Sequence, residues 1–70
     1  MPIMLAPLNE EVKVVKILVD EKSKKHLESL GLVVGSKLTV VSAENGGAVV
    51  IINSKRLVLE HEVASKILVA

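Results

Sequence analysis

The sequence has no cysteine and no phenylalanine, tyrosine or tryptophan. The absence of cysteine excludes disulfides, zinc–thiolate sites and a thiol nucleophile. The absence of aromatic rings removes the side chains on which nucleic-acid bases stack and those that line grooves for proline-rich peptides. A formal net charge of +1 is also far from the strongly basic balance of most nucleic-acid-binding domains. We therefore expect no nucleic-acid partner.

Long hydrophobic runs are missing too. No apolar stretch approaches the ~20 residues that a membrane-spanning helix needs, so we expect no direct membrane insertion. Residues 1–8 lack both the basic region and the long apolar stretch of a signal peptide. Together with the lack of cysteine, this favours a cytoplasmic protein.

What the chain does contain is aliphatic. Half of its 70 residues are hydrophobic, and many are β-branched, which favours strands over long helices. The length fits a single domain, residues 1–70, of a size that buries about 60% of its unfolded surface. The core must then be built from valine, isoleucine and leucine.

Five short segments have the composition of β-strands. In residues 12–19, apolar side chains fall on both faces, which indicates a strand covered on two sides or bent by a bulge. The continuous apolar run at 48–52 indicates a central strand buried on both faces or partly covered by a partner. Asn45-Gly46 is the favoured pair for a tight hairpin, and Asn53-Ser54 predicts a further turn. The predicted strands are residues 12–19, 37–42, 48–52, 55–59 and 68–69.

Two short helices are predicted between these strands. Asp20 offers an N-cap oxygen to a helix over residues 22–30, with Leu27 and Leu30 on its inner stripe. Residues 60–66 can form the second helix, with acidic residues near its start and a lysine near its end, as the helix dipole prefers. Five strands and two helices of one or two turns predict a mainly β fold, a small closed or nearly closed barrel.

Two glycines mark corners of this fold. Gly31 follows the first helix, where the chain usually turns left-handed, and Leu32 beyond it would contact Leu27. Gly35 fits the positive-φ position of a type II turn over residues 33–36. We interpret both glycines as structural corners and not as parts of a ligand cradle.

The order of these parts forms a pattern along nearly the whole chain. A basic pair leads into a short helix that ends in leucine-glycine-leucine, at residues 24–27 and 30–32, and a turn glycine and strand follow at Gly35 and residues 38–41. The closing pattern is basic residue, leucine-x-leucine, acidic helix, alanine, isoleucine and valine, at Arg56, Leu57, Leu59, Glu60, Glu62, Ala64, Ile67 and Val69. This order and spacing resembles the FeoA family, the small cytosolic accessory proteins of bacterial and archaeal ferrous-iron uptake.

Three turn positions depart from the usual pattern of that family. Asn9-Glu10 stands where proline-glycine is usual, and Val34 stands where proline is usual. Gly46-Gly47-Ala48 replaces a glycine-x-proline that the family often has in the central hairpin. All three lie in turns, so they leave the expected fold unchanged.

The resemblance implies a small SH3-like β-barrel of about five strands with two short α-helices. It also implies a non-enzymatic accessory protein of ferrous-iron uptake that docks on the cytoplasmic, GTP-binding part of the FeoB-type membrane transporter. Two alternatives stay open: an SH3-like regulatory domain related to the C-terminal domain of iron-dependent repressors, and a small nucleic-acid-binding barrel. Apolar strand edges also allow self-association into a homo-oligomer.

The sequence offers little for metal binding or catalysis. The metal-ligand candidates are His26 with Glu28, and His61 between Glu60 and Glu62, but neighbouring helix residues point in different directions and no HExxH pair exists. The serines fall in caps, turns and exposed faces, without a histidine and carboxylate placed to activate them. We therefore predict no catalytic residue, no metal ligand and no cofactor.

A basic run over residues 22–26 is the candidate for partner binding. On an exposed helix such a run is usually a solvated face, and the sharper interpretation is a docking patch for an acidic partner surface. We expect the partner contacts at the first helix and its exit, at Lys24, Lys25, Leu30, Gly31 and Leu32.

Overall fold

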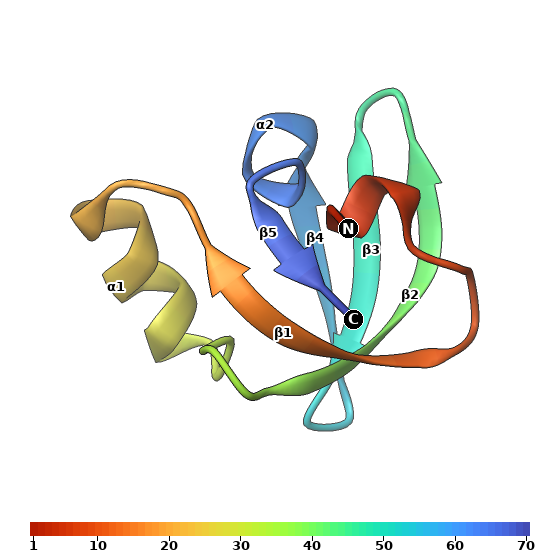
Figure 1. Cartoon of the computed structure of the whole chain (residues 1–70), viewed down its shortest axis with the longest axis horizontal. Coiled ribbons are helices and arrows are strands. Elements are labelled where there is room, and N and C mark those ends of the chain that lie inside the picture. Colours follow the sequence, from red (N-terminus) through yellow and green to blue (C-terminus); the bar gives the residue numbers. More distant parts are fainter.

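The computed structural model describes all residues, 1–70, and contains five strands and two α-helices (Figure 1). In chain order the elements are the 3-10 helix η1 (Ile3–Leu5), β1 (Glu11–Ile17), α1 (Glu21–Ser29), β2 (Lys37–Glu44), β3 (Gly47–Ile52), β4 (Lys55–Glu60), α2 (His61–Ala64) and β5 (Ile67–Val69). The predicted small SH3-like β-barrel with two short helices is confirmed, with element ends that differ by a few residues. Neither helix is long and apolar enough to cross a membrane.

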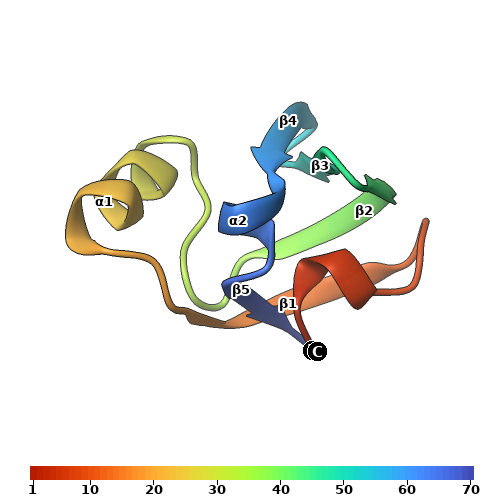
Figure 2. The same ribbon diagram turned by 90° about the horizontal axis from the view of Figure 1, so that it is seen from above.

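All five strands belong to one antiparallel sheet, in the order β4-β3-β2-β1-β5, which curls around the core (Figure 2). Its register shifts in two places, between Val14 and Lys16 on β1 and between Val40 and Ser42 on β2. Such bulges bend a strand and increase its twist, which lets short strands close into a barrel. Of the two interpretations of residues 12–19 the bulge is right, because Val15 is 48% exposed and β1 is not covered on both sides.

A single aliphatic core fills the barrel. Fifteen side chains are buried, and none of them is polar or charged. On β2 and β3 the period-2 alternation directs Leu38, Val40 and Val50 into this core. The outer face of β3 is only partly covered, since Ile51 is 37% exposed. Of the two interpretations of residues 48–52, burial on both faces by the chain itself is therefore wrong, and partial cover by a partner stays a prediction.

Both predicted glycine corners are confirmed. Gly31 has a φ of 88° and Gly35 a φ of 97°, values that L-residues with a Cβ rarely adopt. After Gly31 the backbone N–H of Leu32 donates to the carbonyl oxygen of Leu27 at 3.0 Å, and both leucine side chains are buried. The turn around Gly35 is closed by a 3.0 Å hydrogen bond from the N–H of residue 36 to the carbonyl of residue 33.

The two tight hairpins differ from each other in backbone conformation. Both have two-residue loops, because Glu44 pairs with Gly47 and Ile52 pairs with Lys55. Positive φ at both loop residues, the mark of a type I′ turn, occurs at Asn53-Ser54 (52° and 64°). Neither residue of Asn45-Gly46 has positive φ; the next residue, Gly47, has a φ of 143°. The location of the Asn45-Gly46 turn was predicted correctly, but the glycine that the backbone requires is Gly47.

The N-terminal segment closes the barrel beside β5. Met1 donates from its ammonium group to the carbonyl of Val69 at 2.9 Å, and the N–H of Val69 donates to the carbonyl of Met1 at 2.7 Å. Pro2 bridges to Leu68, and Ile3 is fully buried. The sequence did not predict this closure, because three apolar residues in a 3-10 turn have neither helical nor strand periodicity.

Candidate functional site

The helix that carries the basic run, α1, stands to one side of the barrel (Figures 1 and 2). It is anchored by one buried side chain, Leu27, which is 3% exposed. Asp20 caps its start, as predicted, because its Oδ1 accepts a hydrogen bond from the backbone N–H of Ser23 at 2.8 Å. Most of the other residues of α1 are exposed and can contact another molecule.

The capping carboxylate has a perturbed acidity. The hydrogen bond from the backbone N–H of Ser23 lowers the pKa of Asp20, and the charges of Lys66 and Lys22 lower it further by smaller amounts. A group whose pKa is lower in the folded protein stabilises the fold while it is ionised. Asp20 therefore contributes stability at neutral pH that is lost when the pH falls through its lowered folded-state pKa.

We expect Asp20→Asn to isolate this contribution, because asparagine is also a good N-cap residue but does not titrate. The difference in free energy of unfolding between the natural protein and Asp20→Asn should be constant at neutral pH and should shrink below the ordinary aspartate pKa of about 3.9. Urea unfolding followed by far-UV circular dichroism at several pH values measures it. A difference independent of pH would contradict the prediction.

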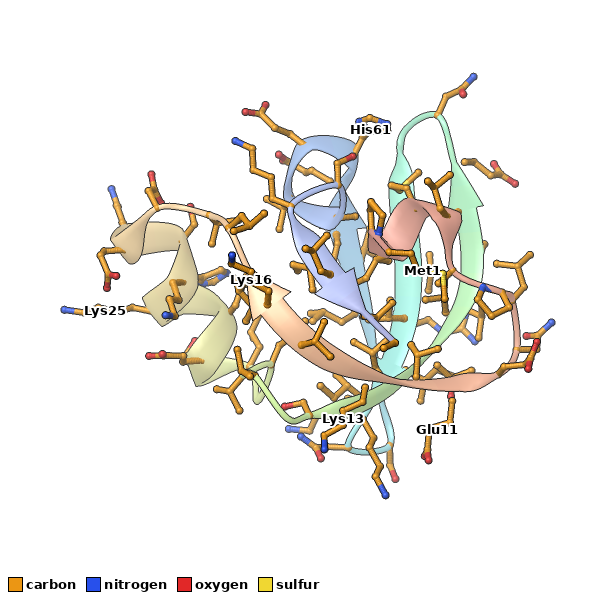
Figure 3. The ribbon with its side chains drawn as sticks, in the orientation of Figure 1. Met1, Glu11, Lys13, Lys16, Lys25 and His61 are labelled. Atoms are coloured by element: carbon orange, nitrogen blue, oxygen red, sulfur yellow. The ribbon has the colours of Figure 1, made fainter.

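The five predicted partner-binding residues do not all reach the surface. Lys25 is exposed and points away from the barrel (Figure 3), and Lys24 is half-buried. Leu30, expected on the inner stripe of the helix, is 39% exposed, so that expectation is wrong. Gly31 is half-buried, whereas Leu32 is fully buried in the core. The side chain of Leu32 therefore packs in the core and cannot itself contact a partner.

The exit of α1 is packed against the loop between β3 and β4. A Cβ atom added at Gly31 would lie 2.6 Å from Nδ2 of Asn53, so the asparagine side chain occupies the space that any larger residue would need. The Oγ of Ser36 accepts from the N–H of Val33 at 3.0 Å and donates to the carbonyl of Gly31 at 3.1 Å. These contacts fix the direction in which the chain leaves the helix.

A groove separates α1 from the barrel wall formed by β4 and α2. It is mainly apolar, and it is lined by His26, Leu27, Leu30, Leu57, Val58, Leu59, Glu60 and Val63. This groove could not be predicted from the sequence, because one wall comes from residues 26–30 and the other from residues 57–63, and only the fold brings them together. The partial exposure of Leu57 and Val63 arises from the same arrangement.

The two histidines lie in different surroundings. His26 lines the groove on α1, whereas His61 begins α2 at another part of the molecule (Figure 3). No three histidine, cysteine, aspartate or glutamate side chains gather where they could hold a metal ion. The hydroxyl of Ser29 donates to the carbonyl of His26, so it serves the helix backbone.

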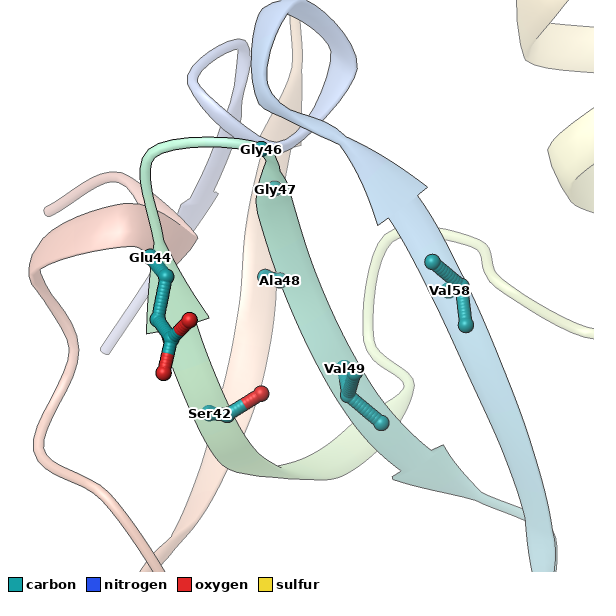
Figure 4. Close-up of a pocket in the computed structure, with 7 residues that line it drawn as sticks. All are labelled: Ser42, Glu44, Gly46, Gly47, Ala48, Val49 and Val58. Carbon is teal, nitrogen blue, oxygen red and sulfur yellow. The ribbon is translucent and has the colours of Figure 1, made fainter.

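A second, shallower depression lies on the outer face of the sheet (Figure 4). It is lined by Ser42, Glu44, Gly46, Gly47, Ala48, Val49 and Val58. One hydroxyl and one carboxylate, without a histidine or a cation beside them, provide no nucleophile and base pair. The groove beside α1 is the better candidate for a functional surface, since it is mainly apolar and borders the helix that carries the basic run.

The family model described as FeoA domain matches residues 1–70. No curated protein matches the chain. Among solved structures, a crystal structure of an iron uptake regulatory protein (FeoA) has a TM-score of 0.87 at 21% identity, covering 99% of this chain and 93% of that one.

Two solution structures are similar as well. The FeoA protein from Chlorobium tepidum has a TM-score of 0.85 at 23% identity, over 99% of this chain and 68% of that one. The iron(II) transport protein A from Clostridium thermocellum has a TM-score of 0.86 at 18% identity, over 99% of this chain and 44% of that one. At these identities the likeness shows a shared fold.

Proposed function

We propose, because the chain belongs to the FeoA family, that it is a non-enzymatic accessory protein of ferrous-iron uptake that docks on the cytoplasmic, GTP-binding part of a FeoB-type membrane transporter. Family membership supports the role in ferrous iron transport and is the observation that carries the proposal. The binding experiment described below tests the docking partner.

The surface that suits such docking is α1 together with the groove beside it. Lys24 and Lys25 supply positive charge on a helix that only Leu27 anchors to the barrel. Charged groups at the rim of an interface mainly steer association and set its orientation, whereas a buried apolar anchor supplies most of the affinity. We infer that an acidic partner surface faces the two lysines while an apolar partner side chain enters the groove beside Leu30.

The proposal assigns no chemical step to this chain. Hydroxyl groups near the site are committed to the backbone, since Ser29 caps a carbonyl of its own helix and Ser36 bridges two backbone groups of the following turn. GTP hydrolysis would be carried out by the partner, and this chain would act by binding to it. The proposed function therefore depends on the contact surface of this chain, and binding is the property to measure.

We expect Lys24→Glu combined with Lys25→Glu to weaken binding to the isolated GTP-binding domain of a FeoB-type transporter from the same cell by about tenfold or more, because like charges then face each other across the interface. Isothermal titration at low ionic strength measures the dissociation constant, since exposed charges are screened by salt. Far-UV circular dichroism should show an intact fold.

A matched control is available on the strands β1 and β2. Lys13 on β1 and Lys37 on β2 are exposed cross-strand neighbours, so Lys13→Glu with Lys37→Glu changes the net charge by the same amount. We expect this control to bind almost as tightly as the natural protein. Equal loss in both double variants would show a general charge effect, and no binding by the natural protein would refute the proposed partner.

A further inference from the structure

The strand β4 is an open edge of the sheet. The other edge strand, β5, is covered by residues 1 and 2 through hydrogen bonds and a bridge. No hydrogen bond outside the sheet ladders reaches the backbone of β4, from either a loop or a side chain. Apart from the carbonyl of Glu60, which begins α2 as its N-cap, its outward N–H and C=O groups are thus available for pairing with another strand.

The turn before β4 determines which residues face outward. In the type I′ turn at Asn53-Ser54, the N–H of Lys55 faces the carbonyl of Ile52. Because the direction alternates along a strand, Leu57 and Leu59 also face β3, and the backbone groups of Arg56, Val58 and Glu60 face outward. The same three residues have exposed side chains, and Val58 is 73% exposed (Figure 4).

The outward-facing residues Arg56, Val58 and Glu60 are complementary to the same three residues of a second copy that runs in the opposite direction. If two copies of β4 pair antiparallel with Val58 opposite Val58, then Arg56 of each copy lies opposite Glu60 of the other. Directly opposed side chains on one face of a sheet lie close enough for opposite charges to attract and for apolar groups to pack. We propose that two copies of this chain associate through β4 in this register, forming one continuous sheet across a two-fold axis.

The register is determined by the same residues. A slip of two residues in either direction keeps outward backbone groups opposite each other, but it places Arg56 opposite Val58 or Val58 opposite Glu60 and removes both ion pairs. A slip of one residue opposes an outward-facing residue with an inward-facing one, so backbone bonds are lost. An interface in which the same patch serves on both subunits is the usual basis of two-fold dimers.

The contact is small, because only residues 56–60 of each edge strand oppose one another in this register. It belongs with weak, transient interfaces, and association should be visible at millimolar protein concentration. Val58 and Glu60 also line the groove beside α1, so strand pairing and partner docking would exclude each other.

Charge reversal tests the register directly. Arg56→Glu alone and Glu60→Arg alone each place like charges opposite each other twice, and we expect each to weaken self-association at least tenfold. An equimolar mixture of the two variants pairs two carboxylates with two guanidinium groups, so we expect it to form mixed dimers of near-natural affinity. Sedimentation with interference detection measures the association, since the chain has no aromatic absorbance.

Two further variants complete the experiment. Val58→Lys puts like charges at the two-fold axis and should leave the chain monomeric, with an unchanged circular dichroism spectrum. Lys25→Glu changes the net charge as much as Arg56→Glu does, but it lies on α1 and should leave self-association unchanged, whatever its effect on transporter binding. A natural protein that stays monomeric at millimolar concentration, or a mixture that associates no better than the single variants, would overturn the proposal.

Discussion

Replacing Gly47 by alanine should cost about 4 kcal/mol or more of the free energy of unfolding, a loss that only severe packing or backbone conflicts produce. The φ of this residue is 143°, which L-residues rarely adopt. A Cβ atom there would lie 2.1 Å from the carbonyl oxygen of Leu59 and 3.2 Å from Cα of Glu60. Both neighbours are backbone atoms, so no side chain can move aside to make room.

The adjacent glycine provides the matched control for this substitution. Gly46 lies in the same turn, has no positive φ, and no atom lies within 4 Å of an added Cβ. Gly46→Ala should therefore change stability by no more than about 0.5 kcal/mol. Urea unfolding followed by far-UV circular dichroism compares the two variants, and equal stabilities would show that the backbone at Gly47 tolerates a side chain.

Shortening Leu32 to alanine should cost about 2–5 kcal/mol, the range measured for leucines in well-packed cores. Leu32 is fully buried, and its N–H bond to the carbonyl of Leu27 joins the helix exit to the barrel. A small domain has a total stability of only about 5–15 kcal/mol. The melting temperature should accordingly fall by about 10 °C or more.

The neighbouring leucine separates folding from binding. Leu30 is 39% exposed and lines the groove, so Leu30→Ala should cost less than about 1 kcal/mol in stability. Under the proposed docking, Leu30→Ala weakens transporter binding while the fold stays intact. Thermal unfolding of both variants is the measurement. A larger loss for Leu30→Ala than for Leu32→Ala would contradict the assignment of Leu32 to the core and Leu30 to the surface.

Features set by neighbouring residues were predicted correctly. The cap at Asp20 and the corners at Gly31 and Gly35 depend on interactions within a few residues, and the structure has all three. The strand segments followed from alternation and composition in the same way. Leu30 was misplaced because three-residue spacing from Leu27 identifies a helix stripe but not its width.

Features set by contacts between distant segments were not predictable in this way. The constraint on Gly47 arises from Leu59 and Glu60 on the neighbouring strand. The groove has one wall on α1 and the other on β4 and α2. The open edge at β4 became recognisable only when the strand order was known. For the candidate site, the sequence predicted the helix and its lysines, whereas the groove beside the helix could be described only from the fold.

The pairing of Met1 with Val69 has a consequence for the order in which the chain acquires its structure. The hairpins β2-β3 and β3-β4 join neighbours in sequence, so their loops close at little entropic cost. Placing β5 between β1 and the first residues instead brings Met1 to Val69, two residues that are 68 positions apart in the sequence. Contacts between such distant positions slow folding. The three-stranded meander β2-β3-β4 can therefore form before the two distant segments meet, and closure of the barrel is the later step.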